Sequence, residues 1–571
     1  TKQEEVAIMK SIKYIYSSLF FLAAGLMTAQ AQDKKADEKA VVNEEIEVVR
    51  PYKPILAEAV KLRRSPNLDD VKTYKAKLNY SILDRKLELN SDIQKLQAQA
   101  LAEEKESILV NNYVKGAFGS LATLLGEAYF NTGKDEGLQV GGYFKHFSQE
   151  GKLNKQNSSN QQLSVFGRSI LEQNTVSGRI NFERNGTYFY GIDDARPTLN
   201  PDKQALTNIE LEGELVKNFT EDEDAFSYAL KANGYIWNDK FSAKENYLSL
   251  NGYVNKRIHS LNLGLAASTE FGNSKDALTS VGNNLLRLNP YIRLQVKGAK
   301  ITAGINFVQE FGAYSSSRIF PAVTADFTLI PDYLQVFGEV KGDVNRNSLK
   351  GFTDENPWLN SNIVVRNTVE KLSFSAGIKG TGGPGFGYKA RVYVKQFDDM
   401  PLFINNYTDF NKFDVIYDFG KTKLTGLEGE ISVQVSDALK WTGKLNIDDW
   451  KPASETYSWF KPGLKVSSNF VYTYNKKLSF NAGVVIQDDI KAKVNISNPV
   501  NPAQYVIPNP LIEEIQTVKG YVDLGLGADY RINKKFSVFA KANNILNTNY
   551  SKYLYYQVNG FNIFGGLTYS F

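Results

Sequence analysis

Few side chains in this sequence are suited to catalysis. The chain has two histidines, His146 and His259, and only His146 lies close to a possible nucleophile, Ser148. Hydrolases combine a histidine with a serine and a third group that orients the imidazole. A histidine at the end of a strand is far more often an interfacial or solvated residue. We therefore expect no enzyme activity and assign no catalytic residue.

Acidic side chains could supply oxygen ligands to a divalent cation. Neighbouring aspartates occur at Asp193-Asp194, Asp398-Asp399, Asp448-Asp449 and Asp488-Asp489. None of these pairs has the ordered spacing of a calcium-binding loop, and the glycine-rich segment 382–387 lacks the Lys-Ser/Thr and helix of a phosphate loop. The absence of cysteine excludes thiolate metal sites and disulfides. We expect neither a metal site nor a cofactor.

The histidines and aspartates named above lie on or between segments whose pattern predicts strands. Residues 522–530 alternate strictly, with Val522, Leu524, Leu526, Ala528 and Tyr530 opposite Asp523, Gly525, Gly527 and Asp529. Similar alternation recurs from 111 to 571, and short turns alternate with long connections, as in a membrane β-barrel. We predict an all-β, antiparallel transmembrane barrel at 111–571, with about 22 strands and a range of 14 to 24. No repeat of ~40–50 residues supports a soluble propeller.

Composition agrees with this fold. The chain of 571 residues is 12% aromatic but only 42% hydrophobic, which suits a barrel with aromatic girdles and a polar lumen. The net charge of +5 gives no electrostatic argument for binding nucleic acid. The last strand places Tyr569, Leu567 and Ile563 on one face and small or polar residues on the other, with Phe564 as the exception.

The two ends of the chain carry predicted targeting signals. Residues 9–31 have a basic start, an apolar core and a small-x-small cleavage site, which predicts a signal peptide. Gly566, Tyr569 and Phe571 are interpreted as a C-terminal signal for the barrel-assembly machinery. Residues 32–110 lack a large apolar core and are predicted to form a periplasmic or lumen segment.

Two stretches carry a family resemblance. Residues 539–550, Phe-Ala-Lys-Ala-Asn-Asn-Ile-Leu-Asn-Thr-Asn-Tyr, resemble the penultimate strand of TonB-dependent outer-membrane receptors. Residues 417–430 contain Gly-Lys followed by Gly-x-Glu-x-Glu, which resembles another strand of that family. The resemblance implies residence in the outer membrane of a Gram-negative bacterium, a 22-stranded barrel, an N-terminal plug and energy supplied by TonB.

Within the resemblance, a short β-prone segment looks like a TonB box, which would pair with TonB as an added strand. It consists of Glu45, Ile46, Glu47, Val48 and Val49. A linker strand is the alternative. Residues 32–110 are too few for a full plug, so the chain resembles a shortened, Bacteroidota-type relative. An unplugged barrel of this size would leak, so we expect residues 32–110, inward-folded loops or a partner to close it.

Aromatic residues in the expected outer loops could stack on a ligand or form the membrane girdle. The candidates are Trp358, Phe403, Tyr407, Trp459 and Tyr505. We expect uptake or passage of a solute across the outer membrane, and the alternative is a non-transporting accessory or scaffold barrel of an assembly or secretion complex. Expected partners are outer-membrane lipid and lipopolysaccharide, the barrel-assembly machinery, and TonB or a surface lipoprotein.

Overall fold

The computed structural model describes residues 112–132, 137–192, 200–218, 226–383, 385–436, 438–475, 477–496 and 512–571. The signal peptide at 9–31, the segment 32–110 with its TonB-box-like residues, and Tyr505 lie outside the described residues. Those three assignments stay predictions.

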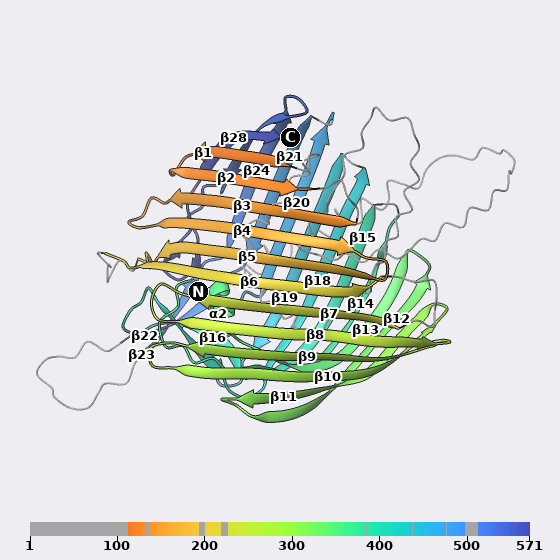
Figure 1. Ribbon diagram of the computed structural model, residues 1–571. Helices are drawn as coiled ribbons and strands as arrows, with labels where there is room; N and C mark the ends of the chain where they lie inside the picture. The colour runs from red at the N-terminus through yellow and green to blue at the C-terminus, as the bar shows by residue number, and fades with distance from the viewer. Residues whose placement is uncertain are drawn as a thin grey trace, which may run out of the picture. The chain divides into compact units, whose positions relative to one another are not determined.

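Twenty-two strands form one antiparallel barrel (Figure 1). Each strand pairs with the next along the chain, and β1 also pairs with β28, which closes the sheet on itself. The predicted fold and strand number are confirmed. The barrel strands are β1 (Tyr113–Gly119), β2 (Thr123–Asn131), β3 (Leu138–Glu150), β4 (Asn157–Ile170), β5 (Asn174–Tyr188), β6 (Lys203–Lys217), β7 (Ser227–Asn238), β8 (Lys244–Ile258), β9 (Leu261–Lys275), β10 (Ser280–Val296), β11 (Ala299–Gly312), β12 (Ser316–Ile330), β13 (Leu334–Asn345), β14 (Thr368–Thr381), β15 (Phe386–Asp398), β18 (Thr422–Ser436), β19 (Leu439–Lys451), β20 (Leu464–Tyr474), β21 (Leu478–Gln487), β24 (Tyr521–Arg531), β25 (Phe536–Asn543) and β28 (Asn562–Ser570).

The alternation of each strand separates an apolar outer face from a polar inner face. On β28, Ile563 and Leu567 are exposed on the outside, whereas Thr568 and Ser570 are buried on the inside. The exception noted in the sequence, Phe564, faces inward and packs against Phe539 and Ala117 in a small apolar cluster. The predicted division of this strand is confirmed.

The closing seam between β1 and β28 requires close backbone approach. A Cβ on Gly566 would lie 1.9 Å from the carbonyl oxygen of Gly116, so the two strands can pair only with glycine there. At the end of β28, the ring of Tyr569 stacks on Phe571, whose ring also lies 5.9 Å from Phe130. Aromatic side chains thus line the rim next to the seam.

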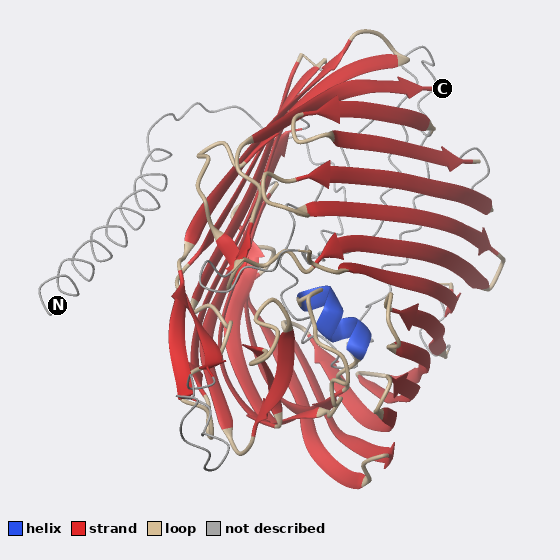
Figure 2. Cartoon of the chain, turned by 90° about the vertical axis from the view of Figure 1, so that its left-hand side faces the viewer, coloured by secondary structure: helices blue, strands red, loops and turns tan. Residues whose placement is uncertain are grey.

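One end of the barrel carries short turns and the other carries the long connections, which by the rule for outer-membrane barrels face the outside. The long connections hold all the other elements that the structure describes. These are α2 (Leu349–Glu355), β16 (Met400–Asn405), β17 (Phe413–Asp418), β22 (Ile490–Ile496), β23 (Ile512–Val518), β26 (Ser551–Tyr553) and β27 (Tyr556–Gln557). Strands β17, β16, β22 and β23 form a four-stranded sheet. Figure 2 shows α2 enclosed by the ring of barrel strands. In the described residues, no helix is long and apolar enough to cross a membrane.

Candidate functional site

Five long connections fold together at the outer end of the barrel. We call them the loop lid, which comprises the described residues of 346–367, 399–421, 452–463, 488–520 and 544–561. Their apolar side chains share one core, in which Phe352, Phe413 and Trp459 are fully buried. Aromatic rings from different loops are in contact: the ring of Trp358 stacks on Tyr556 at 3.7 Å between centroids. The lid is therefore a small folded unit rather than a set of independent loops.

Polar bonds join one lid loop to another. The Lys461 ammonium lies 2.8 Å from a carboxylate oxygen of Glu355, and the Lys493 ammonium lies 2.8 Å from Glu455. The indole N–H of Trp459 donates to the same Glu455 carboxylate at 2.8 Å. These partially buried ion pairs connect three of the five loops. They fix how the loops are arranged around the apolar core.

Asp418, at the end of β17, holds the following lid loop in place. Its carboxylate accepts the backbone N–H groups of Ala453, Ser454 and Glu455 at 2.7–3.0 Å, and it also accepts the hydroxyl of Thr422. Burial by itself would raise the pKa of Asp418, but the hydrogen bonds to the charged form outweigh it and hold the pKa below its ordinary value. The charged carboxylate thus stabilises this part of the lid.

The lid docks on the inner wall of the barrel at Glu245 of β8, whose side chain is fully buried. Glu245 accepts the backbone N–H of Leu349 at the start of α2 at 2.6 Å, and pairs with the guanidinium of Arg346 at 3.2 Å. Hydroxyls of Tyr235 and Ser274 donate to the same carboxylate at 2.5 and 3.0 Å. Each oxygen of this buried anion therefore has a partner from the wall and a partner from the lid.

Further contacts cross the mouth of the barrel. The indole N–H of Trp358 donates to the carbonyl of Tyr188 at the end of β5, and the amide of Asn411 donates to Phe189. Trp237 of β7 shares the lid core with Trp459, which follows β19. Counting around the ring, β19 lies ten strands on from β7 in a barrel of 22. Lid loops that start on one half of the barrel therefore reach the inner wall of the other half.

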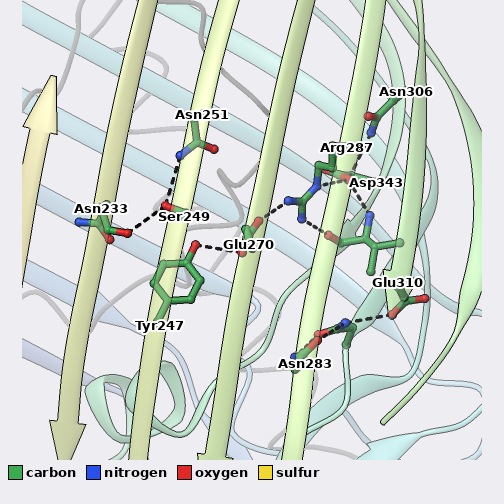
Figure 3. A network of polar contacts seen from close by, with 12 residues as sticks. Asn233, Tyr247, Ser249, Asn251, Glu270, Asn283, Arg287, Asn306, Glu310 and Asp343 are labelled. Atoms are coloured by element: carbon green, nitrogen blue, oxygen red, sulfur yellow. Dashed lines mark hydrogen bonds and ion pairs between the residues drawn. The ribbon is translucent and has the colours of Figure 1, made fainter. Parts of the chain in front are cut away.

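Beneath the lid, a hydrogen-bonded network runs around the inner wall from β7 to β13 (Figure 3). At its centre, Arg287 of β10 lies between two carboxylates: its Nε is 3.0 Å from Asp343, and a second nitrogen contacts Glu270. Its third nitrogen donates to the carbonyl of Val344 at 2.6 Å. The Tyr247 hydroxyl donates to Glu270 at 3.0 Å. The buried charges of this network are thus paired with one another.

The network also reaches the root of the lid. Asn283 of β10 donates to the side chain of Asn367 at 2.7 Å, and Asn367 donates to Glu310 at 2.9 Å. Asn367 is the last residue of the first lid connection. The polar wall therefore anchors both the beginning of that connection, through Glu245, and its end.

The opposite half of the inner wall is also charged. Arg391 pairs with Glu428 at 2.6 Å, and Lys444 pairs with Glu430 at 3.2 Å. A lumen lined by ion pairs and amides suits a hydrophilic solute. In the part of the chain that the structure describes, no three His, Cys, Asp or Glu side chains are grouped to hold a metal ion.

The loop aromatics named from the sequence lie in two environments. Trp358, Phe403 and Trp459 come together in the lid core, where Phe403 and Trp459 are buried. Tyr407 is 52% exposed. Sequence reasoning missed Glu245 and Arg287, and the only available signal was their place on the polar face of a strand. His146 lies on the outer face of β3, where its Nδ1 is 3.5 Å from the Gln161 amide.

The outward apolar face, the polar lumen and the 22 closed strands define an outer-membrane β-barrel protein of a Gram-negative bacterium. No family model and no curated protein matches the sequence. Solved structures do match. The pyoverdine outer-membrane receptor FpvA from Pseudomonas aeruginosa is 12% identical, with 81% of this chain and 78% of that chain covered and a TM-score of 0.59.

Two further structures agree. The FrpB iron transporter from Neisseria meningitidis is 9% identical, with 81% of each chain covered and a TM-score of 0.60. The ferric-catecholate import receptor Fiu from E. coli is 9% identical, with 81% of this chain and 82% of that chain covered and a TM-score of 0.59. All three are TonB-dependent outer-membrane receptors, and the chain has the fold of their barrels.

Proposed function

We propose that this protein moves a hydrophilic solute across the outer membrane through its lumen, and that the loop lid closes the lumen at the outer end. The observation that carries the proposal is the docking of the lid on the buried carboxylate of Glu245 and, farther across the mouth, on the carbonyls of Tyr188 and Phe189. A barrel of 22 strands needs such a closure to avoid leakage. The lid supplies one without a full plug.

The fold neighbours support the direction of transport and suggest a first solute to test. FpvA binds pyoverdine, and Fiu imports ferric catecholates. By analogy of fold, we propose ferric siderophores as the first solute class to examine. Trp358, Phe403 and Trp459 would then act by shaping the lid, while Tyr407 and Tyr505 are proposed to contact the solute from outside.

The remaining parts of the proposal concern the N-terminal region and the partners. Residues 32–110 would form a reduced, plug-like segment, as in a shortened Bacteroidota-type relative. Residues 45–49 would pair with TonB to energise transport. A surface lipoprotein could deliver the solute, and Gly566, Tyr569 and Phe571 would be recognised by the barrel-assembly machinery.

A disulfide that ties the lid to the connection after β5 tests the proposal. The N–H of Ile192 donates to the carbonyl of Tyr555 at 3.2 Å, and one such bond holds the two Cα atoms about 5–7 Å apart, the range that disulfides span. The chain has no cysteine, so Ile192→Cys with Tyr555→Cys forms one defined bridge. We expect the oxidised double variant to lose uptake, and a reductant to restore it.

Uptake is measured in cells that carry the variant as their only copy. Iron-55 siderophores are the first probe, and depletion of solutes from the medium, followed by mass spectrometry, extends the test to any hydrophilic solute. Each single-cysteine variant is the matched control. Equal uptake by bridged and unbridged cells would reject transport through a moving lid. It would favour the scaffold alternative, which a pull-down of the bridged protein with assembly or secretion machinery would then support.

A further inference from the structure

An apolar groove of about 740 Å³ runs across the wall of the barrel over β12, β13, β14, β15, β18 and β19, which lie side by side in Figure 1. The strand register shows that the groove lies on the outer face. Ala325, Gly338 and Ala376 are direct cross-strand neighbours and form its floor. Val392 continues the same row, and it is 54% exposed, as expected for a residue facing lipid.

The groove has the length of an extended hydrocarbon chain. Six neighbouring strands spaced about 4.8 Å apart extend over about 24 Å. A second row of outward residues, which includes Phe374 and Val394, forms its side nearer the loops; both residues are about half exposed. Because lipid-facing walls of barrels are normally convex, a hollow of this size creates a specific place for an acyl chain.

A row of lysines lies at the loop end of the same face. Lys423 of β18 and Lys451 of β19 are cross-strand partners, and each lies two residues from a lining residue, Thr425 or Asp449. Lys371 of β14 is exposed nearby and pairs with Asp398. Lys451 pairs with Asp449, while Lys423 has no ion-pair partner among the residues that the structure describes. Cations therefore adjoin one end of the apolar groove.

The position of the lysines indicates which lipid fits. Strand ends next to the loops lie at the headgroup level of the outer leaflet, where an ammonium group can reach an anion in the interface. We propose that this face binds a phosphorylated glycolipid of the lipid A type, with an acyl chain in the groove and a phosphate at Lys423 and Lys451. The acyl anchor of a lipoprotein would fill the groove but offers no phosphate to the lysines.

Binding to purified protein tests the two halves of this site separately. The full chain in detergent is titrated with diphosphoryl lipid A and with its dephosphorylated form. Each lysine near an anionic headgroup contributes about 1 kcal/mol of binding free energy. Replacing both, Lys423→Glu with Lys451→Glu, should therefore weaken binding of the diphosphoryl form about thirtyfold. The matched control is Lys244→Glu with Lys275→Glu, which changes another exposed cross-strand lysine pair at the loop end, on β8 and β9. We expect this control to bind as the parent does.

The groove itself is tested at Gly338. A Cβ there would come no closer than 3.9 Å to another atom, so a large side chain can enter the groove without disturbing the wall. Gly338→Trp should weaken lipid A binding, and Gly338→Ala should not. Heat-modifiable migration on a gel shows that each variant barrel is folded.

Three results would overturn the proposal. Unchanged binding of lipid A to the double lysine variant would remove the phosphate contact. Unchanged binding to Gly338→Trp would remove the groove. Equal affinity for the dephosphorylated lipid would show that any acyl chain suffices, as a lipoprotein anchor would provide.

Discussion

Replacing Glu245 with alanine should release the loop lid. The side chain is fully buried and accepts hydrogen bonds from Leu349 and Ser274 while it pairs with Arg346. Its loss leaves the guanidinium of Arg346, itself 8% exposed, buried without this carboxylate. Breaking a buried pair in this way costs about 3–5 kcal/mol, because the remaining charge is uncompensated. The free energy needed to open the lid should fall by that amount.

A single engineered thiol reports this free energy. Ala492 of β22 is fully buried in the lid core, and the chain has no other cysteine, so Ala492→Cys can react with a maleimide only when the lid opens. If opening and closing are fast relative to labelling, the labelling rate follows the open population. Adding Glu245→Ala should then speed labelling roughly two hundred to several thousand times.

A matched control separates the lid from the wall. Glu212 lies on the inner face of β6, where it pairs with Lys231 at 3.1 Å, and both side chains are partly exposed. Glu212→Ala removes a comparable charge that contacts no lid residue, and surface pairs of this kind contribute little. We expect no change in labelling. If Glu245→Ala also left the rate unchanged in a correctly folded barrel, the docking role of Glu245 would be refuted.

Three further outcomes follow from the structure. Asp418→Asn should weaken the lid by about 1–3 kcal/mol and speed labelling at Ala492→Cys. In the Ala492→Cys protein with Asp418 intact, the same contribution is present above pH about 4 and fades as the pH falls through the lowered pKa, so its labelling rate should approach that of the Asp418→Asn variant in acid. A ratio of the two rates that stayed constant with pH would contradict this, since the thiolate fraction affects both rates equally. Gly566→Ala should reduce the yield of heat-modifiable barrel by blocking the seam, whereas Gly126→Ala, where a Cβ meets open space, should assemble normally. Burial raises the pKa of Asp239 to about 6, so the folded loop 239–243 favours the protonated carboxyl. Its protection factor for hydrogen exchange should therefore be highest below pH about 4 and fall as the pH rises through 6. A protection factor that rose with pH would contradict this.

The barrel could be predicted from the sequence because its pattern is local. On β24, Asp523 and Asp529 face the lumen as the alternation indicates, and Leu526 is exposed on the outside. A period of two needs only a few neighbouring residues to be visible, and each strand repeats it independently. The strand count followed from that repetition.

The lid could not be predicted in the same way. Leu349 meets Glu245 from 104 residues away, and Trp358 meets Tyr188 from 170 residues away. No periodicity marks such pairs, because irregular loops bury their aromatics wherever the fold brings them together. The sequence therefore places Trp459 in an outer loop, to stack on a ligand or to join the membrane girdle, whereas it is fully buried in the structure. Its burial depends on residues that other loops and the barrel wall bring together around it.

The shared core of the lid also bears on how this protein can change over generations. Loops that project singly from a barrel can diversify one at a time under pressure from phages or antibodies. Here a substitution at Phe352 is felt by Phe403, on a separate loop, because their rings are in contact. Selection must therefore act on five loops as one inherited unit. We expect natural variation to concentrate instead in connections outside that core.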